Sequence, residues 1–273
     1  LFGDLQDMDE LKTMVENYLK EFPKGKYSAD AIRMRGIQML VANDLSGARD
    51  LFGKAIKENG DALGGKLEEM LFFMGNASFA LHEWAEANSA YEQYLKKFPN
   101  GEYKDEINYR KSLSLFFKGE YQKALDAFEK YIKDNPDTPF TPDAEYRIAA
   151  SYMEAEPPRP DDVIKKCQAW IKKYEGNSER NGLMPEVLSL LGDAYTRLDK
   201  KEEEAAEAYS RGVKLEASDE VLQYLLFEAN KQYQKIGKWE KSVELFQDFI
   251  VRHPKHPGVV QSMCWLAKAK AKG

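Results

Sequence analysis

The chain has few residues of the kinds that form disulfide frameworks or metal sites. Its 273 residues include two cysteines, Cys167 and Cys264, and three histidines. Two cysteines cannot make a disulfide framework, and they leave the redox compartment open. Neither has a histidine near it in sequence, so buried structural thiols are favoured over nucleophiles at both positions.

The sequence also has no excess of basic residues and no long apolar run. It carries 40 Lys and Arg against 46 Asp and Glu, a net charge of −6, which argues against nucleic-acid binding. The longest apolar run, around Met70–Leu81, is interrupted by Gly75 and Asn76 and is too short to span a membrane. Hydrophobic residues nevertheless make up 43% of the chain and aromatic residues 12%, which excludes a disordered protein.

Sequence motifs of catalysis are missing as well. The chain contains no P-loop, no G-x-G-x-x-G, no G-x-S-x-G and no H-E-x-x-H. His253 and His256 could bind a metal only with a third ligand such as Cys264, and we favour polar residues of a turn instead. We therefore expect no enzyme, no metal and no cofactor. Two facing acids of a glycosidase in a closed helical barrel would leave no motif, so this alternative stays open.

One pattern recurs along the whole chain. In the segment GEYQKALDAFEKYIKDNP, the small residue Ala124 is followed by Phe128, Tyr131 and Ile132, and Pro136 closes the segment. The corresponding first residues of all copies lie at positions 11, 48, 87, 124, 163, 205 and 242, with steps of 37 to 42 residues. A near-constant step of this size indicates stacked supersecondary units.

Each copy predicts a helix, and a second helical segment precedes it. Apolar residues at i, i+4, i+7 and i+8 form one face of a helix. Short polar turns such as Asn43-Asp44 and Gly119-Glu120 separate the two helices of a unit, and joints such as FPKGKY and FPNGEY separate the units. The sequence thus predicts an all-α fold of antiparallel helix pairs.

The pairs resemble tetratricopeptide repeats. That family has Leu-Gly in its first helix, a small residue and then an aromatic residue in its second helix, and a closing Pro. Leu191-Gly192, Ala205 and Tyr209 match it, as does the set Met74-Gly75, Ala87, Tyr91 and Pro99. The resemblance implies a right-handed α-solenoid of about seven units, and we expect residues 1–273 to form a single array.

Two departures separate the sequence from the common repeat. The step exceeds the usual ~34 residues, and Ser112 and Asn230 replace the first-helix glycine in two copies. The longer step and its joints are similar to periplasmic bacterial repeat proteins, namely the lipoprotein of the outer-membrane β-barrel assembly machine and the Tol–Pal-associated protein. This resemblance implies the bacterial periplasm or cell envelope as the location.

The ends predict a piece of a longer chain. The sequence begins with Leu1, opens in a second helix over residues 5–22 and finishes in a first helix over His256–Lys270. Each of these helices lacks its partner. Trp265 lies in the last helix, although terminal units normally carry a polar outer face.

Tetratricopeptide repeat proteins usually hold a peptide or a partner helix in the concave groove formed by their first helices. Transferring the groove positions gives the candidate partner-binding residues Phe72, Asn76, Phe79, Tyr109, Arg110, Leu113, Phe116, Tyr146, Arg147 and Met153. Arg110 and Arg147 would bind acidic groups. Phe72, Phe79 and Phe116 could equally belong to the core, whereas Tyr109 and Tyr146 are expected to face the groove because their hydroxyls tolerate water.

The predicted function is a non-catalytic scaffold that binds another protein or peptide. The alternative is a structural spacer, or a self-association segment that pairs through its terminal helices. The sequence names neither the partner nor the oligomeric state.

Overall fold

The computed structural model describes residues 5–272, with side chains for residues 10–60 and 62–272. Over residues 5–272 it contains fourteen α-helices, one short 3-10 helix and no strand. The chain divides into two compact units, which meet in sequence at Lys118 and Gly119. We call them unit 1 and unit 2 and describe each by itself.

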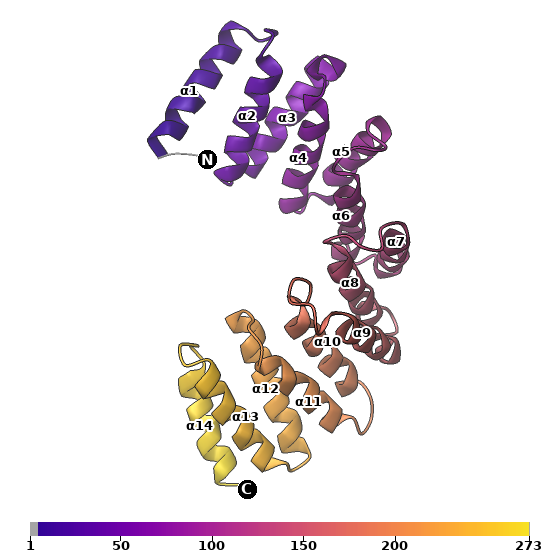
Figure 1. Ribbon diagram of the computed structural model, residues 1–273, viewed down its shortest axis with the longest axis vertical. Helices are drawn as coiled ribbons and strands as arrows, with labels where there is room; N and C mark the ends of the chain where they lie inside the picture. The colour runs from indigo at the N-terminus through magenta and orange to yellow at the C-terminus, as the bar shows by residue number, and fades with distance from the viewer. Residues whose placement is uncertain (1–4, 273) are drawn as a thin grey trace. The chain divides into compact units, whose positions relative to one another are not determined.

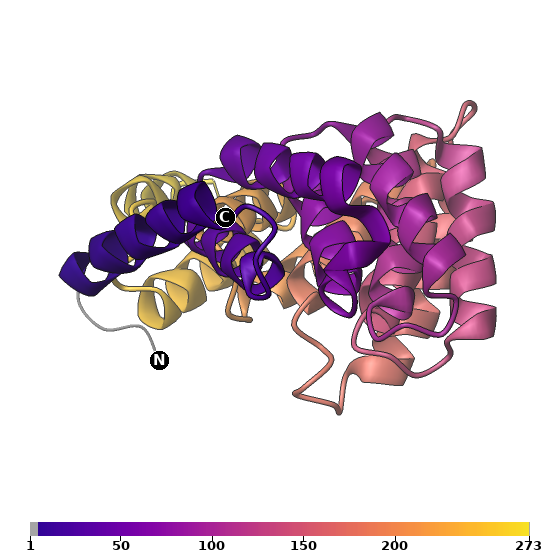
Figure 2. The ribbon, with the colours of Figure 1, turned by 90° about the horizontal axis from the view of Figure 1, so that it is seen from above.

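Unit 1 contains six α-helices and the 3-10 helix. Their bounds are α1 Leu5–Glu21, α2 Ser28–Val41, α3 Leu45–Asn59, η1 Gly60–Leu63, α4 Lys66–Ala80, α5 Trp84–Lys97 and α6 Lys104–Phe117. Consecutive helices pack against one another, and α2 also contacts α4 directly. The helices α1 to α4 lie side by side in both ribbon views (Figures 1 and 2).

Unit 2 contains the other eight helices that the structure describes. Their bounds are α7 Tyr121–Asp134, α8 Thr141–Glu154, α9 Pro160–Tyr174, α10 Met184–Thr196, α11 Glu202–Val213, α12 Asp219–Lys235, α13 Trp239–Arg252 and α14 Val259–Lys270. Each helix packs against the next, and α10 also contacts α8 and α12. The even-numbered helices are the first helices of the pairs and the odd-numbered ones the second helices.

This arrangement confirms the predicted all-α fold of antiparallel helix pairs. The boundaries differ from the prediction at α14, which begins at Val259 and not at His256. His256 instead stabilises the joint, because its Nδ1 accepts a hydrogen bond of 2.9 Å from the backbone N–H of Gly258. The prediction about Leu1 lies outside the described residues.

A glycine lets the two helices of a pair approach closely. A Cβ at Gly75 would lie 2.4 Å from the ring of Tyr91, and one at Gly192 would lie 2.4 Å from the ring of Tyr209. Real Cβ atoms do not approach a ring so closely, so the first-helix glycine and the second-helix aromatic residue are one packing unit. The facing small residues Ala87 and Ala205 are fully buried.

The joint between pairs is held by the closing aromatic residue. The Tyr94 hydroxyl donates a 2.5 Å hydrogen bond to Glu68 and accepts one of 2.9 Å from the backbone N–H of Tyr103. In unit 2, the indole Nε1 of Trp170 donates to the carbonyl of Pro142 at 2.8 Å. The bond to Tyr103 pairs the backbone N–H just before α6, and the bond to Pro142 ties α9 to the first turn of α8.

Candidate functional site

Each unit has one surface that its first helices build. We call it the first-helix face: α2, α4 and α6 form it in unit 1, and α8, α10, α12 and α14 form it in unit 2. The residues predicted to bind a partner lie on these helices. Seven of them are in unit 1 and three, Tyr146, Arg147 and Met153, are in unit 2.

Four of the predicted residues are buried. Phe72, for which core and groove were equally open, belongs to the core of unit 1, where its ring stacks on Tyr103 at 4.0 Å with an interplanar angle of 10°. Leu113, Met153 and Tyr109 are also buried. For Tyr109 this corrects the expectation of an exposed ring, since a hydroxyl tolerates water but does not require it.

Phe79 and Phe116 are half-buried within an aromatic cluster. The Phe79 ring lies 5.1 Å from Trp84 and 6.2 Å from Phe117, in edge-on contacts. Phe117 lies next to Phe116, is itself exposed, and was not among the predicted residues.

The two predicted arginines already carry acidic partners from their own helices. The Nε of Arg110 donates to Glu106 at 2.7 Å, and that of Arg147 donates to Asp143 at 3.2 Å. The guanidinium of Arg147 also lies 5.3 Å from the centre of the half-buried Tyr146 ring. Burial raises the pKa of the Tyr146 hydroxyl, and the charge of Arg147 opposes this shift.

Asn76 is positioned by the second helix of its pair. Its Oδ1 accepts a 2.7 Å hydrogen bond from the Tyr91 hydroxyl. Burial raises the pKa of Tyr91, so this hydroxyl stays protonated and donates at neutral pH. Asn76 therefore keeps a fixed orientation on the first-helix face of unit 1.

The corresponding place in unit 2 carries Asp193, a groove position of the repeat that is not among the ten candidate partner-binding residues. Its Oδ1 accepts hydrogen bonds of 2.6 Å from both Tyr209 on α11 and Tyr224 on α12. A signal for it exists in the repeats. The residue after the first-helix glycine is Asn76 or Asp193 where the second helix carries Tyr91 or Tyr209, and it is Ile37 where that helix carries Phe52.

Phe227 of α12 is a second groove position that is not among the ten candidate partner-binding residues. Phe227 is exposed, and its ring lies 5.9 Å from Trp265 of α14. Trp265 is half-buried, because it also packs on Phe246. Lys231 Nζ lies 6.0 Å from the centre of the Phe227 ring.

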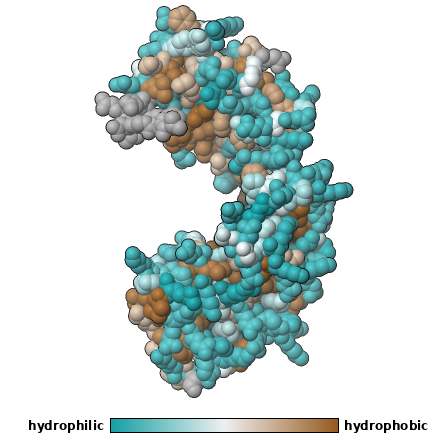
Figure 3. Space-filling model, in the orientation of Figure 1, coloured by the Kyte–Doolittle hydropathy of each residue, from teal (hydrophilic) through white to brown (hydrophobic). Residues whose placement is uncertain are grey.

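Exposed apolar side chains concentrate on the first helices. Among the described side chains, eleven large apolar residues are exposed, and seven of these lie on first helices: Met34, Val41, Phe117, Tyr224, Phe227, Val260 and Met263. Only Met14 and Val251 lie on second helices. Figure 3 shows hydrophobic surface gathered over α1 and α2 in unit 1 and over α13 and α14 in unit 2.

The cysteines and histidines form no metal centre within the described residues. Cys167 is buried, as expected, and burial raises its pKa to about 12, so its thiol is unreactive. Cys264 is exposed, which corrects the prediction of a buried thiol, since α14 turns Trp265 and Ala269 rather than Cys264 toward its neighbours. His253 and His256 contact backbone carbonyl oxygens of Val213 and Asp219 through Nε2.

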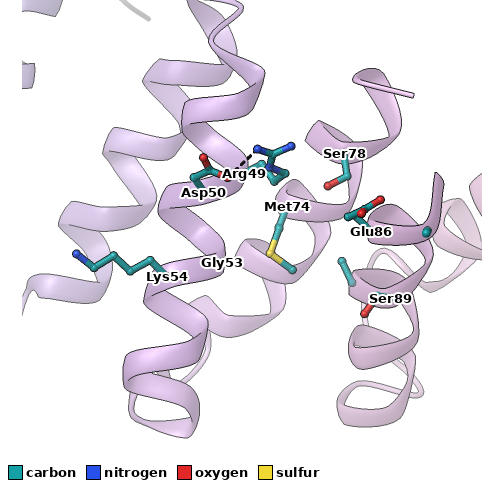
Figure 4. A pocket seen from close by; sticks show the side chains of 10 residues that line it. Arg49, Asp50, Gly53, Lys54, Met74, Ser78, Glu86 and Ser89 are labelled. Atoms are coloured by element: carbon teal, nitrogen blue, oxygen red, sulfur yellow. Dashed lines mark hydrogen bonds and ion pairs between the residues drawn. The ribbon is translucent and has the colours of Figure 1, made fainter. Parts of the chain in front are cut away.

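A hollow of about 680 Å³ lies on another side of unit 1, between the second helices α3 and α5 (Figure 4). Met74 and Ser78 of α4 form its floor, and Gly53 and Ser89 are small residues on its walls. Arg49 at its edge is already paired with both Asp50 and Glu83. No catalytic constellation of nucleophile and base lines this hollow.

Comparisons with known proteins agree with the repeat pattern. Residues 72–139 match one tetratricopeptide repeat model, and residues 229–256 match another. The predicted resemblance to tetratricopeptide repeats is confirmed for these two segments. No curated protein matches the chain at a significant level of sequence similarity.

Several solved structures share the fold. A tetratricopeptide repeat protein from Parabacteroides merdae matches with a TM-score of 0.60 and 12% identity over 96% of this chain and 93% of that one. A MamA segment from Desulfovibrio magneticus matches with a TM-score of 0.55 and 20% identity over 70% and 96%. The pilF protein of Pseudomonas aeruginosa matches with a TM-score of 0.56 and 10% identity over 90% and 97%. At these identities the likeness shows the fold alone.

Within residues 5–272, no helix has both the length and the apolar character that crossing a bilayer requires.

Proposed function

We propose that this chain is a non-catalytic scaffold that binds a peptide or a partner helix of another protein on its first-helix faces. The main support for this proposal is the placement of the exposed large apolar side chains, most of which lie on first helices. Tetratricopeptide repeats in general mediate protein–protein interaction, which supports the proposal. Exposed apolar residues on a helical surface are what a partner's apolar side chains bind.

The structure changes which residues would touch the partner. Buried Phe72, Tyr109, Leu113 and Met153 would support the surface from within, whereas Val41, Phe117, Tyr224 and Phe227 are exposed to a ligand. Among the residues selected from the sequence, we retain Asn76, Phe79, Arg110, Phe116, Tyr146 and Arg147 as partner contacts in this proposal. A location in the bacterial cell envelope stays a prediction from the sequence resemblance.

The test compares exposed apolar residues on the two kinds of helix. Val41 of α2 and Phe227 of α12 are 66% and 45% exposed, while Met14 of α1 and Val251 of α13 are 65% and 78% exposed. Each is replaced by Glu, which adds a charge without removing a core residue. We expect Val41→Glu or Phe227→Glu to reduce capture of a partner from a native extract, because a charge in an apolar contact is costly.

The second-helix variants Met14→Glu and Val251→Glu should capture the same proteins as wild type. All variants are checked first for an unchanged helical melt. If the first-helix and second-helix variants lost partner capture to the same extent, or if all variants captured the same proteins, the proposed binding surface would be contradicted.

A further inference from the structure

Asp193 is a carboxylate that its own chain fixes in place without a cation. The hydroxyls of Tyr209 and Tyr224 both donate to Oδ1 at 2.6 Å. Among the side chains that the structure describes, no Lys, Arg or His forms an ion pair with Asp193. The second oxygen, Oδ2, is thus left for a donor from outside the chain.

The two tyrosines keep this geometry at neutral pH. Burial raises the pKa of Tyr209, and the nearby charges of Asp193 and Glu228 raise it further. The pKa of Tyr224 is raised by burial and by its hydrogen bond to Asp193. Both hydroxyls therefore remain protonated donors, and the carboxylate is held from two different helices, α11 and α12.

The surroundings of Asp193 are acidic and aromatic. Glu186 lies two turns earlier on the same side of α10, and its Oε2 is buried without a hydrogen-bond partner. Glu228 of α12 pairs with Lys231 at 3.1 Å. Beside these groups the Tyr224 and Phe227 side chains are 43% and 45% exposed.

The equivalent position of another repeat, Asn76, provides an internal comparison. Asn76 accepts from Tyr91 as Asp193 accepts from Tyr209, and both follow the first-helix glycine. A neutral amide thus satisfies the structural role of this position. The negative charge at Asp193 has no structural need that Asn would not meet, which points to a ligand.

We propose that the first-helix face of unit 2 binds a basic protein segment, in which one Lys or Arg side chain pairs with Asp193 and a neighbouring apolar side chain packs on Phe227. This inference rests on the proposed function and names the chemistry of the partner. A guanidinium or ammonium group placed at Oδ2 would also lie near the exposed ring of Tyr224, and such cations are attracted to aromatic faces. Among the described side chains, Glu228 is paired with Lys231, whereas Asp193 and Glu186 form no ion pair, so their field favours a positively charged segment.

The test uses a random dodecapeptide library displayed on phage and the full chain as target. Selection is run in parallel on wild type and on Asp193→Asn, which copies the residue found at Asn76. We expect wild type to enrich peptides with Arg or Lys next to an apolar residue. Synthetic versions should bind Asp193→Asn about three- to fivefold more weakly, as losing one partly exposed charge pair to a fixed carboxylate would predict.

A matched control, Asp126→Asn, makes the same change in net charge on the second helix α7. It should leave the peptide affinity unchanged, because Asp126 lies away from the first-helix face. Asp193→Asn should also keep the fold, with a melt close to that of wild type, since an amide oxygen has two lone pairs and can accept both tyrosine hydrogen bonds.

The outcomes separate this inference from the proposed function. Enriched peptides that lack basic residues, or that bind Asp193→Asn as tightly as wild type, would overturn the inference. If such peptides still bind Phe227→Glu more weakly than wild type, the inference about a basic segment fails but the proposed function stands. Failure to enrich any peptide would count against both.

Discussion

At the scale of single residues, the tyrosines that link the two helices of a pair are the most informative. Tyr91 and Tyr209 occupy the aromatic position of their repeats, and each is buried with its hydroxyl bonded to a first-helix side chain. The aromatic position could be read from the sequence. The bond from Tyr224 to Asp193 could not, because it joins residues 31 positions apart on neighbouring first helices.

The raised pKa of Tyr209 predicts a loss of stability at alkaline pH. In the unfolded chain this hydroxyl ionises near pH 10, but in the folded chain it stays protonated to higher pH. The contribution of the buried hydroxyl to the free energy of unfolding is complete below pH 10 and falls above pH 10 by about 1.4 kcal/mol per pH unit. We therefore expect the stability difference between wild type and Tyr209→Phe to shrink between pH 10 and 11, measured by urea unfolding.

The exposed residue Tyr27 supplies the control for this measurement, as Tyr27→Phe also removes one hydroxyl. A difference between wild type and Tyr209→Phe that is independent of pH would contradict the assignment.

At the scale of helices and turns, most features follow from the repeat. The turn within a pair places one residue in the left-handed region, with φ of 76° at Gly119 and 73° at Gly237. Lys200 occupies the same region at φ 59°, where a side chain with a Cβ is strained. The sequence predicted the turn at Gly119 from its glycine, but Lys200 carries no comparable signal.

This strain leads to a prediction about stability. Lys200→Gly should stabilise unit 2 by about 0.5–1 kcal/mol. Glycine adopts the left-handed conformation without the steric cost of a Cβ, and this gain exceeds the larger conformational entropy that a glycine loses on folding. Chemical denaturation followed by circular dichroism would measure it. The reciprocal change Gly237→Lys should destabilise by a similar amount, and a stabilising effect of both changes would refute the explanation.

The faces of the helices were harder to predict than the helices themselves. The repeat placed Phe72 and Tyr109 on the first-helix face, yet both are buried, because Tyr103 from the joint covers Phe72 and neighbouring elements cover Tyr109. A helical period fixes which side of a helix is apolar, but it does not fix how closely the next element packs on it.

At the scale of the whole molecule, the exposed apolar surface bears on the alternative of self-association. Val260 and Met263 of α14 are exposed. Two side chains supply far less than the roughly 1,200 Å² that a stable interface buries. We expect a monomer at micromolar concentration in sedimentation velocity, and a dimer that Val260→Glu dissociates would favour the self-association segment instead.

The sequence by itself determined the helices, their pairing and their turns, because these depend on local spacing: an apolar residue every three or four positions, a glycine facing an aromatic ring, and a proline that ends a helix. Only the tertiary structure decided which side chains reach solvent and which meet across helices. The carboxylate of Asp193 between two tyrosines is such a case. Burial and side-chain contact depend on how elements distant in sequence pack against one another, and a local sequence pattern does not determine that packing.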